Sequence, residues 1–269
     1  MEVWGGNRAT AQSFETAGLR IWAYSQPYED SAAGGDVYYL SSCASGRITR
    51  MLLADVSGHG EQVAGVAKDL RDLMRRNVNV IKQTRFVSAM NQQFGELNEG
   101  ENFATALVST FFAPTKTLTL CNAGHPPPAI YRQQSEKWSE VSDAETSSPE
   151  IADTPLGVDD QAVYYQRDMQ LEPGDMVLSF SDAVTESEDE QGNQLGGKGI
   201  LGMISRINCD DPNQIIPDLV DSITAMNNQN LRQDDATIFL IQATGVGARL
   251  KDTLLAPFRL IRGQSTPAL

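Results

Sequence analysis

The sequence predicts an α+β fold in which antiparallel β-sheets are covered by helices packed on the outside. Strand-like segments come first, two helix-like segments follow, and further strands, helices and a final strand complete the order. This order lacks the regular strand–helix alternation of a doubly wound parallel sheet. With 41% apolar and 21% charged residues, the chain has the composition of an ordinary globular protein, and its 269 residues suffice to bury a core.

The first part of the chain is predicted to form three strands and then two helices. β-branched and aromatic residues favour strands over residues 19–26, 36–41 and 47–56. Apolar residues then recur at helical spacing from residue 61 to about residue 79, and again over 84–97.

The second part returns to strands before two more helices. Residues 103–112 and 116–124 are predicted to form a hairpin with Pro114 in its turn, followed by a strand within 126–131. Residues 133–154 are rich in Ser, Glu and Asp and are expected to form an exposed loop. The remaining expected elements are strands over 162–171 and 174–182, helices over 197–206 and 212–227, and a last strand over 235–243.

We expect one domain over residues 19–243, because the chain has no internal repeat and no clear linker. Residues 1–18 are then an N-terminal extension and residues 244–269 a C-terminal extension with a short helix. The segment 247–263 is locally basic, with apolar residues on one face and an interruption at Pro257. A terminal helix packed on the domain is the simpler interpretation, and a partner-binding or membrane-surface helix is the alternative.

Charge, cysteine content and hydropathy exclude several classes of protein. A net charge of −14 argues against a general nucleic-acid binder, which would carry a basic face. The three cysteines are widely spaced and form neither a CxxC metal site nor a disulfide framework, which favours a reducing compartment. No signal-like run and no apolar stretch of 18 residues occurs. We therefore expect a cytoplasmic protein for which membrane association is not predicted.

Aspartates recur at the ends of the predicted core strands. Asp36 starts one strand, Asp55 and Asp182 end two others, and Asp234 and Asp235 begin the last. Carboxylates gathered at one end of a sheet repel one another and take up protons unless cations neutralise them. Mg²⁺ or Mn²⁺ suits such an oxygen-rich site. A single Asp at a strand–helix junction is more often a helix cap, but the recurrence favours a metal site.

The stretch "GHGEQVAG" (58–65) has an alternative interpretation as a dinucleotide-binding loop. It does not have the G-x-G-x-x-G spacing, and the surrounding segments are not in strand–helix–strand order. A nucleotide-binding protein is therefore a minor alternative.

Seven short motifs, taken together and in order, resemble a known enzyme family. They are "GGD" (34–36), "DVSGHG" (55–60), "FATA" (103–106), "NAGHPPP" (122–128), "PLG" (155–157), "LSFSDAVTE" (178–186) and "QDDAT" (233–237). This set is similar to that of bacterial PPM (2C-type) metal-dependent serine/threonine phosphatases, in the sporulation and stress-response branch called SpoIIE-like or RsbU-like. The resemblance covers about residues 19–243.

The resemblance implies an αββα fold, a central β-sandwich flanked by helices on both faces, with two divalent cations, Mn²⁺ or Mg²⁺, at one edge. By position, Asp36 would hold one metal, and Asp55 would bridge both and position the attacking water. The backbone carbonyl of Val56 would add a ligand, and Asp182 and Asp234 would complete the second site. Secondary candidates are Asp235, His59 and Gly35.

The implied chemistry is hydrolysis of phosphoserine or phosphothreonine by a metal-activated water, with no phosphoenzyme intermediate. The implied substrate is a phosphoprotein, a phosphorylated STAS-type anti-anti-sigma regulator in a partner-switching pathway, with a regulatory protein as a further partner. The oligomeric state stays open.

Three positions depart from the family pattern or are ambiguous. Ser57 occupies the slot in which many 2C-type enzymes carry a histidine, so the role of that histidine does not transfer to His59. His125 is either catalytic or structural. Ala183 stands where the family commonly has glycine, and would strain the loop if the position required φ > 0. These departures support one alternative function, a pseudophosphatase binding module that keeps the fold without efficient catalysis.

Overall fold

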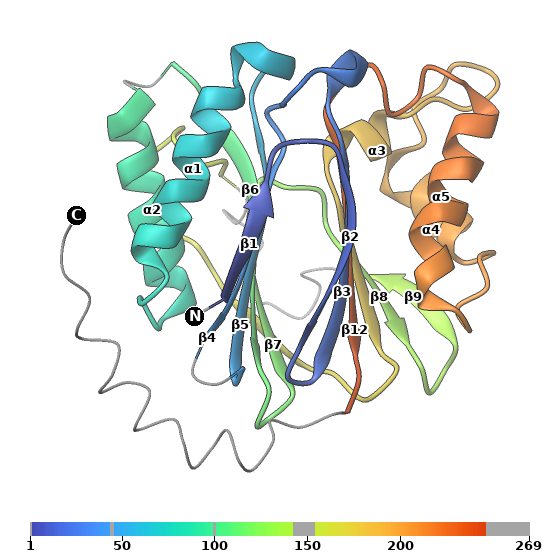
Figure 1. Ribbon diagram of the computed structural model, residues 1–269, viewed down its shortest axis with the longest axis horizontal. Coiled ribbons are helices and arrows are strands. Elements are labelled where there is room, and N and C mark those ends of the chain that lie inside the picture. The colour runs from blue at the N-terminus through green and yellow to red at the C-terminus, as the bar shows by residue number, and fades with distance from the viewer. Residues whose placement is uncertain (1, 44–45, 99–100, 142–153, 246–269) are drawn as a thin grey trace.

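Two six-stranded β-sheets lie face to face in the computed structural model, which describes residues 2–43, 46–98, 101–141 and 154–245. Every pairing between the named strands is antiparallel. Helices α1 and α2 cover one outer face, and α4 and α5 cover the other (Figure 1). The predicted αββα sandwich is therefore confirmed.

The first sheet has the strand order β1-β4-β5-β6-β7-β10. Its strands are β1 (Glu2–Gly6), β4 (Val37–Cys43), β5 (Ile48–Val56), β6 (Ala104–Phe112), β7 (Thr117–Ala123) and β10 (Arg167–Gln170). The second sheet has the order β2-β3-β12-β11-β8-β9. Its strands are β2 (Thr10–Thr16), β3 (Leu19–Gln26), β12 (Ala236–Ala243), β11 (Met176–Phe180), β8 (Ala129–Arg132) and β9 (Lys137–Glu140).

Helices α1, α2, α4 and α5 lie within three residues of the predicted helical segments, whereas α3 was not predicted. The 3₁₀ turns are η1 (Tyr28–Asp30) and η2 (Gly60–Gln62), and the α-helices are α1 (Ala64–Asn77), α2 (Gln83–Asn98), α3 (Asp182–Glu186), α4 (Gly196–Ile204) and α5 (Pro212–Met226). Among the described residues, no helix combines the length and the apolar character that a bilayer crossing requires.

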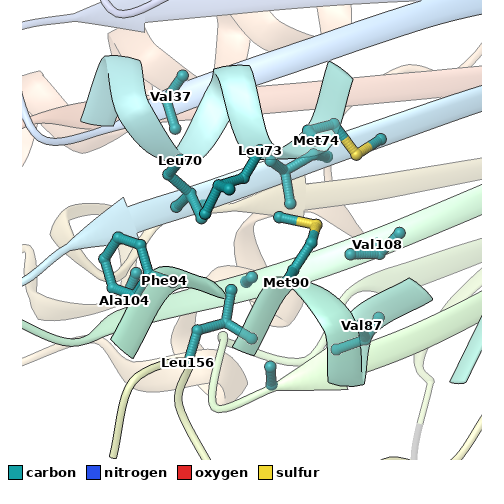
Figure 2. Packing of buried hydrophobic residues seen from close by; sticks show 14 of the residues in the cluster. Val37, Leu70, Leu73, Met74, Val87, Met90, Phe94, Ala104, Val108 and Leu156 are labelled. Carbon is teal, nitrogen blue, oxygen red and sulfur yellow. The ribbon is translucent and has the colours of Figure 1, made fainter. Parts of the chain in front are cut away.

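Three apolar layers hold the sandwich together. Figure 2 shows the first layer, in which Leu70, Leu73 and Met74 of α1 and Met90 and Phe94 of α2 lie over the first sheet. Each of these side chains is at most 1% exposed, and full burial of such a side chain contributes about 1.5–3 kcal/mol. A second layer fills the space between the sheets, and a third lies between the second sheet and α3, α4 and α5.

The structure differs from the sequence-based expectation in four segments. Residues 1–18, expected to be an extension, contain β1 and β2, each of which adds a strand to one sheet edge. The expected exposed loop 133–154 contains β9, and the expected strand 162–171 is reduced to β10. Asp182 was expected to end a strand, but it begins α3. Residues 142–153 and the expected C-terminal helix after residue 245 lie outside the described residues.

Strand register brings the predicted site residues to one end of the sandwich. In the first sheet Val37 pairs with Ala54, so the start of β4 lies beside the end of β5. In the second sheet Phe180 pairs with Ile238, so the end of β11 lies beside the start of β12. Asp36, Asp55, Asp182 and Asp234 therefore flank these strand ends, with two contributed by each sheet.

Candidate metal centre

Asp55 lies at the middle of an acidic cluster. Burial, together with repulsion from Asp182, Asp234 and Asp235, raises the pKa of its carboxyl group to about 8. Strand β5 fixes its backbone, because Asp55 pairs with Thr105 of the central strand β6. A carboxylate held rigidly among other carboxylates is stable in its charged form only when a cation lies nearby. Asp55 therefore has the environment expected of a bridging metal ligand.

Asp36 is a deeply buried acid of the cluster, with 2% of its surface exposed. Burial raises its pKa well above the ordinary value, and repulsion from Asp55 adds to the shift. Ser181 and Thr237 lie close enough to lower this pKa, but their hydroxyls donate to the Asp235 carbonyl and to Ser25. Within the described residues, neither carboxylate oxygen of Asp36 has a hydrogen-bond partner. A buried carboxylate without partners is costly, and a bound cation would satisfy it.

Asp182 and Asp234 come from the second sheet and are partly exposed. Burial raises the pKa of Asp182, while backbone N–H groups at the start of α3 lower it. Burial raises the pKa of Asp234 to about 6, and one of its carboxylate oxygens accepts a 2.7 Å hydrogen bond from the backbone N–H of Asp235. Each keeps oxygen atoms that could bind a cation.

Glu186 belongs to the same acidic group and was missed in the sequence. It lies one helical turn after Asp182 in α3, and it contributes to the raised pKa of Asp55. The i, i+4 spacing of two acids in "SDAVTE" is the signal that could have identified it.

Asp235 organises the backbone of the site. Its carboxylate is 2% exposed and accepts hydrogen bonds from the backbone N–H groups of Tyr28 (2.8 Å), Gly35 (2.7 Å) and Gly60 (2.9 Å). Gly34 permits this approach, because a Cβ atom at that position would collide with the Asp235 carboxylate. These three bonds occupy most of the acceptor capacity of the carboxylate, so Asp235 holds three backbone segments of the site together.

The Val56 carbonyl lies where the first sheet meets the "GGD" loop. A Cβ atom on Gly35 would come within 2.9 Å of this carbonyl oxygen, so the absence of a side chain lets the loop close over it. Gly35 thus contributes its N–H to Asp235 and its small size to the packing around Val56.

The two histidines occupy different environments. The ring of His59 stacks on Tyr28, with ring centroids 4.1 Å apart, and lies near enough to Asp234 to lower the pKa of that acid. His125 is 3% exposed, and burial lowers its pKa to about 3, so the ring is neutral at physiological pH. Its Nδ1 lies 2.8 Å from the Thr105 hydroxyl, next to Asp55. A ring with this pKa cannot act as a general acid near pH 7.

Ala183 does not strain the backbone. It lies in the first turn of α3 and is absent from the non-glycine residues with positive φ. The condition under which alanine would have weakened the site is therefore not met.

The residues present fit divalent cations by their chemistry. The donors are carboxylate and carbonyl oxygens, the type that Mg²⁺ and Mn²⁺ prefer, and their raised pKa values show that the cluster lacks a neutralising charge. Over the described ranges, no three acidic, histidine or cysteine side chains already surround a common point as ligands. Ligand binding would thus require these side chains to move together on a fixed backbone.

The nucleotide-loop interpretation of residues 58–65 does not fit this architecture. The strand before the loop, β5, pairs antiparallel with both of its neighbours, so the loop is not part of a βαβ unit.

Comparisons with known proteins agree with the fold and with the family resemblance. Residues 45–244 match the family model of Stage II sporulation protein E (SpoIIE). Phosphoserine phosphatase RsbU of Bacillus subtilis (strain 168) is 24% identical over 223 residues, which are 82% of this chain and 63% of RsbU. This chain thus spans less than two thirds of the length of that relative.

Two solved structures share the fold. The RsbU and RsbW domains of Rv1364c from Mycobacterium tuberculosis match with a TM-score of 0.69 and 21% identity, over 96% of this chain and 71% of theirs. The PP2C phosphatase domain of SpoIIE from Bacillus subtilis, solved with a fragment of its regulatory domain, matches with a TM-score of 0.70 and 14% identity, over 87% of this chain and 70% of that structure. Because the family model covers most of the sequence, this chain belongs to the SpoIIE family and has the PP2C phosphatase fold.

Proposed function

We propose that this chain is a metal-dependent protein serine/threonine phosphatase. The observation that carries the proposal is the buried acidic cluster: Asp36 has no hydrogen-bond partner among the described residues, and the pKa of Asp55 is about 8. The carboxylates of such a cluster stay charged at neutral pH only when cations lie nearby. Its relative RsbU is a phosphoserine phosphatase, which supports the same reaction here.

The cations would be held by the oxygens of Asp36, Asp55, Val56, Asp182 and Asp234. When bound, two divalent cations activate water and stabilise the negative charge that develops on a phosphoryl group.

The remaining site residues position these ligands. Asp235 fixes the loops around Gly35 and Gly60 through their N–H groups. Neutral His125 supports Thr105 beside Asp55. As the family resemblance implies, a metal-activated water would attack the phosphorus, and hydrolysis would proceed without a phosphoenzyme.

The substrate is proposed to be a phosphorylated STAS-type anti-anti-sigma protein in the cytoplasm, with a regulatory protein as a further partner. The sequence resemblance implies this class. The Mycobacterium tuberculosis neighbour, in which RsbU and RsbW domains occur in one protein, supports a partner-switching context.

The test is hydrolysis of p-nitrophenyl phosphate by the purified chain with Mn²⁺, with Mg²⁺ and with EDTA, beside Asp55→Asn and Asp182→Asn. We expect metal-dependent turnover that each substitution reduces by at least about a hundredfold, because each removes a charge from the cluster. Full turnover by Asp55→Asn would refute the proposal. A folded protein that is inactive with both metals would favour the pseudophosphatase instead.

A further inference from the structure

A cavity of about 540 Å³ opens from the acidic centre along the second sheet. Asp182 and Glu186 of the acidic centre line this cavity, together with Glu140 and Lys198. Its volume lies in the range of sites that bind small molecules or short peptide segments. We call this cavity the α3–α4 groove.

Part of the lining of the α3–α4 groove is apolar or free of side chains. Pro126, Pro127, Gly196 and Gly197 belong to this part. A Cβ atom on Gly196 would have no neighbour within 4 Å, and one on Gly197 would meet only the Glu140 carboxylate, at 3.4 Å. Because these glycines present bare backbone, an extended polypeptide could approach the wall closely.

Charge is distributed unevenly along the groove. Lys198 is the cationic residue among the lining residues, and Glu140, Asp182 and Glu186 are the acids. Lys198 is exposed, and no ion pair to it is found among the described residues. In a chain of net charge −14, an anionic substrate approaches against repulsion. An unpaired cation in the groove would offset this repulsion at one point.

We propose that the α3–α4 groove binds the polypeptide segment around the phosphorylated serine, and that Lys198 selects substrates with an acidic side chain in this segment. The proposal rests on the phosphatase function, because Asp182 and Glu186 of the acidic centre line the groove. It adds a substrate class, phosphoserine in an acidic sequence, and a specificity-determining residue.

The experiment compares two phosphoserine peptides that differ only in carrying glutamates or lysines around the phosphoserine. The enzymes are the wild-type chain, Lys198→Glu and Lys137→Glu, assayed with Mn²⁺. Lys137 is a matched control, because it is exposed and lies at the opposite end of β9 from Glu140. We expect the wild type to prefer the glutamate peptide, and Lys198→Glu to reduce this preference at least about fivefold, mainly through KM. Lys137→Glu is expected to keep the wild-type preference.

A second readout separates this inference from the phosphatase proposal. Binding of the same two peptides, fluorescently labelled, is measured by anisotropy with each protein. Charge-dependent binding that Lys198→Glu reverses would support the groove even if no protein hydrolysed a phosphate, in which case the phosphatase proposal alone would fail. Hydrolysis with an unchanged peptide preference in Lys198→Glu would overturn the groove proposal. An equal loss on both peptides and on p-nitrophenyl phosphate would also overturn it, since Lys198 would then contact the phosphate.

Discussion

Replacement of Asp235 by alanine tests whether this acid positions the site or binds metal. Its carboxylate accepts three backbone hydrogen bonds, from Tyr28, Gly35 and Gly60. Each N–H group left without a partner costs about 1–3 kcal/mol, and water entering the space would recover part of this. We therefore expect Asp235→Ala to lower the free energy of unfolding by about 3–5 kcal/mol, a large share of the 5–15 kcal/mol typical of a domain.

The assay is urea unfolding of the metal-free protein in EDTA, followed by tryptophan fluorescence. Asp234→Asn is the control, because repulsion and burial raise the pKa of Asp234 and its neutralisation should not destabilise the metal-free fold. If Asp235 acted as a metal ligand only, its loss would lower stability in the presence of metal and not in EDTA. A metal-free Asp235→Ala protein within about 0.5 kcal/mol of the wild type would refute the positioning role.

Three further predictions concern the same end of the sandwich. The free energy of unfolding of the metal-free protein should fall as pH rises from about 4 to about 8. The raised pKa of Asp55 means that the folded state keeps a proton over this range that the unfolded state has lost. In a series of urea unfolding curves at different pH values, Asp55→Asn should show a smaller fall. Because Ala183 lies in helix α3, Ala183→Gly should lower the free energy of unfolding by about 0.5–1 kcal/mol without raising turnover. Thermal denaturation measures the first effect, and a p-nitrophenyl phosphate assay measures the second. Gly34→Ala should reduce turnover at least about tenfold in a protein with native circular dichroism, because the added methyl group displaces the Asp235 carboxylate.

Each of these predictions has a contradicting result. A metal-free stability that rises between pH 4 and pH 8 would mean that the Asp55 carboxylate is already neutralised by the protein. A more active Ala183→Gly enzyme would mean that this position samples a non-helical conformation. Wild-type turnover by Gly34→Ala would mean that the loop moves away from Asp235 without consequence.

The sandwich could be predicted from the sequence because its core strands and helices carry strong hydrophobic patterns. The segments 19–26 and 84–97 differ by no more than a residue at each end from β3 and α2. β1 and β2 could not be predicted, since "EVWGG" and "TAQSFET" have little apolar alternation and become strands by pairing with β4 and β3. Tertiary contacts, rather than local propensity, determine such edge strands.

The candidate site was predictable to the extent that its residues lie at strand ends. Asp36, Asp55 and Asp182 follow or precede apolar runs, and strand register alone then brings them to one end of the sandwich. The role of Asp235 could not be predicted, because its N–H partners are 175 to 207 positions away in the chain. No local pattern records a contact of that separation.

The two neighbouring acids at the start of β12 have different roles. Asp234 lies in the acidic cluster, whereas Asp235 accepts hydrogen bonds from the backbone N–H groups of Tyr28, Gly35 and Gly60. The loop before Asp36 is held from a second side by Asn7, whose side-chain amide donates to the Gly34 carbonyl at 3.0 Å. The repulsion among the clustered acids is therefore opposed by hydrogen bonds that do not involve those acids. Through Asn7, the segment between β1 and β2 becomes part of the support of the site.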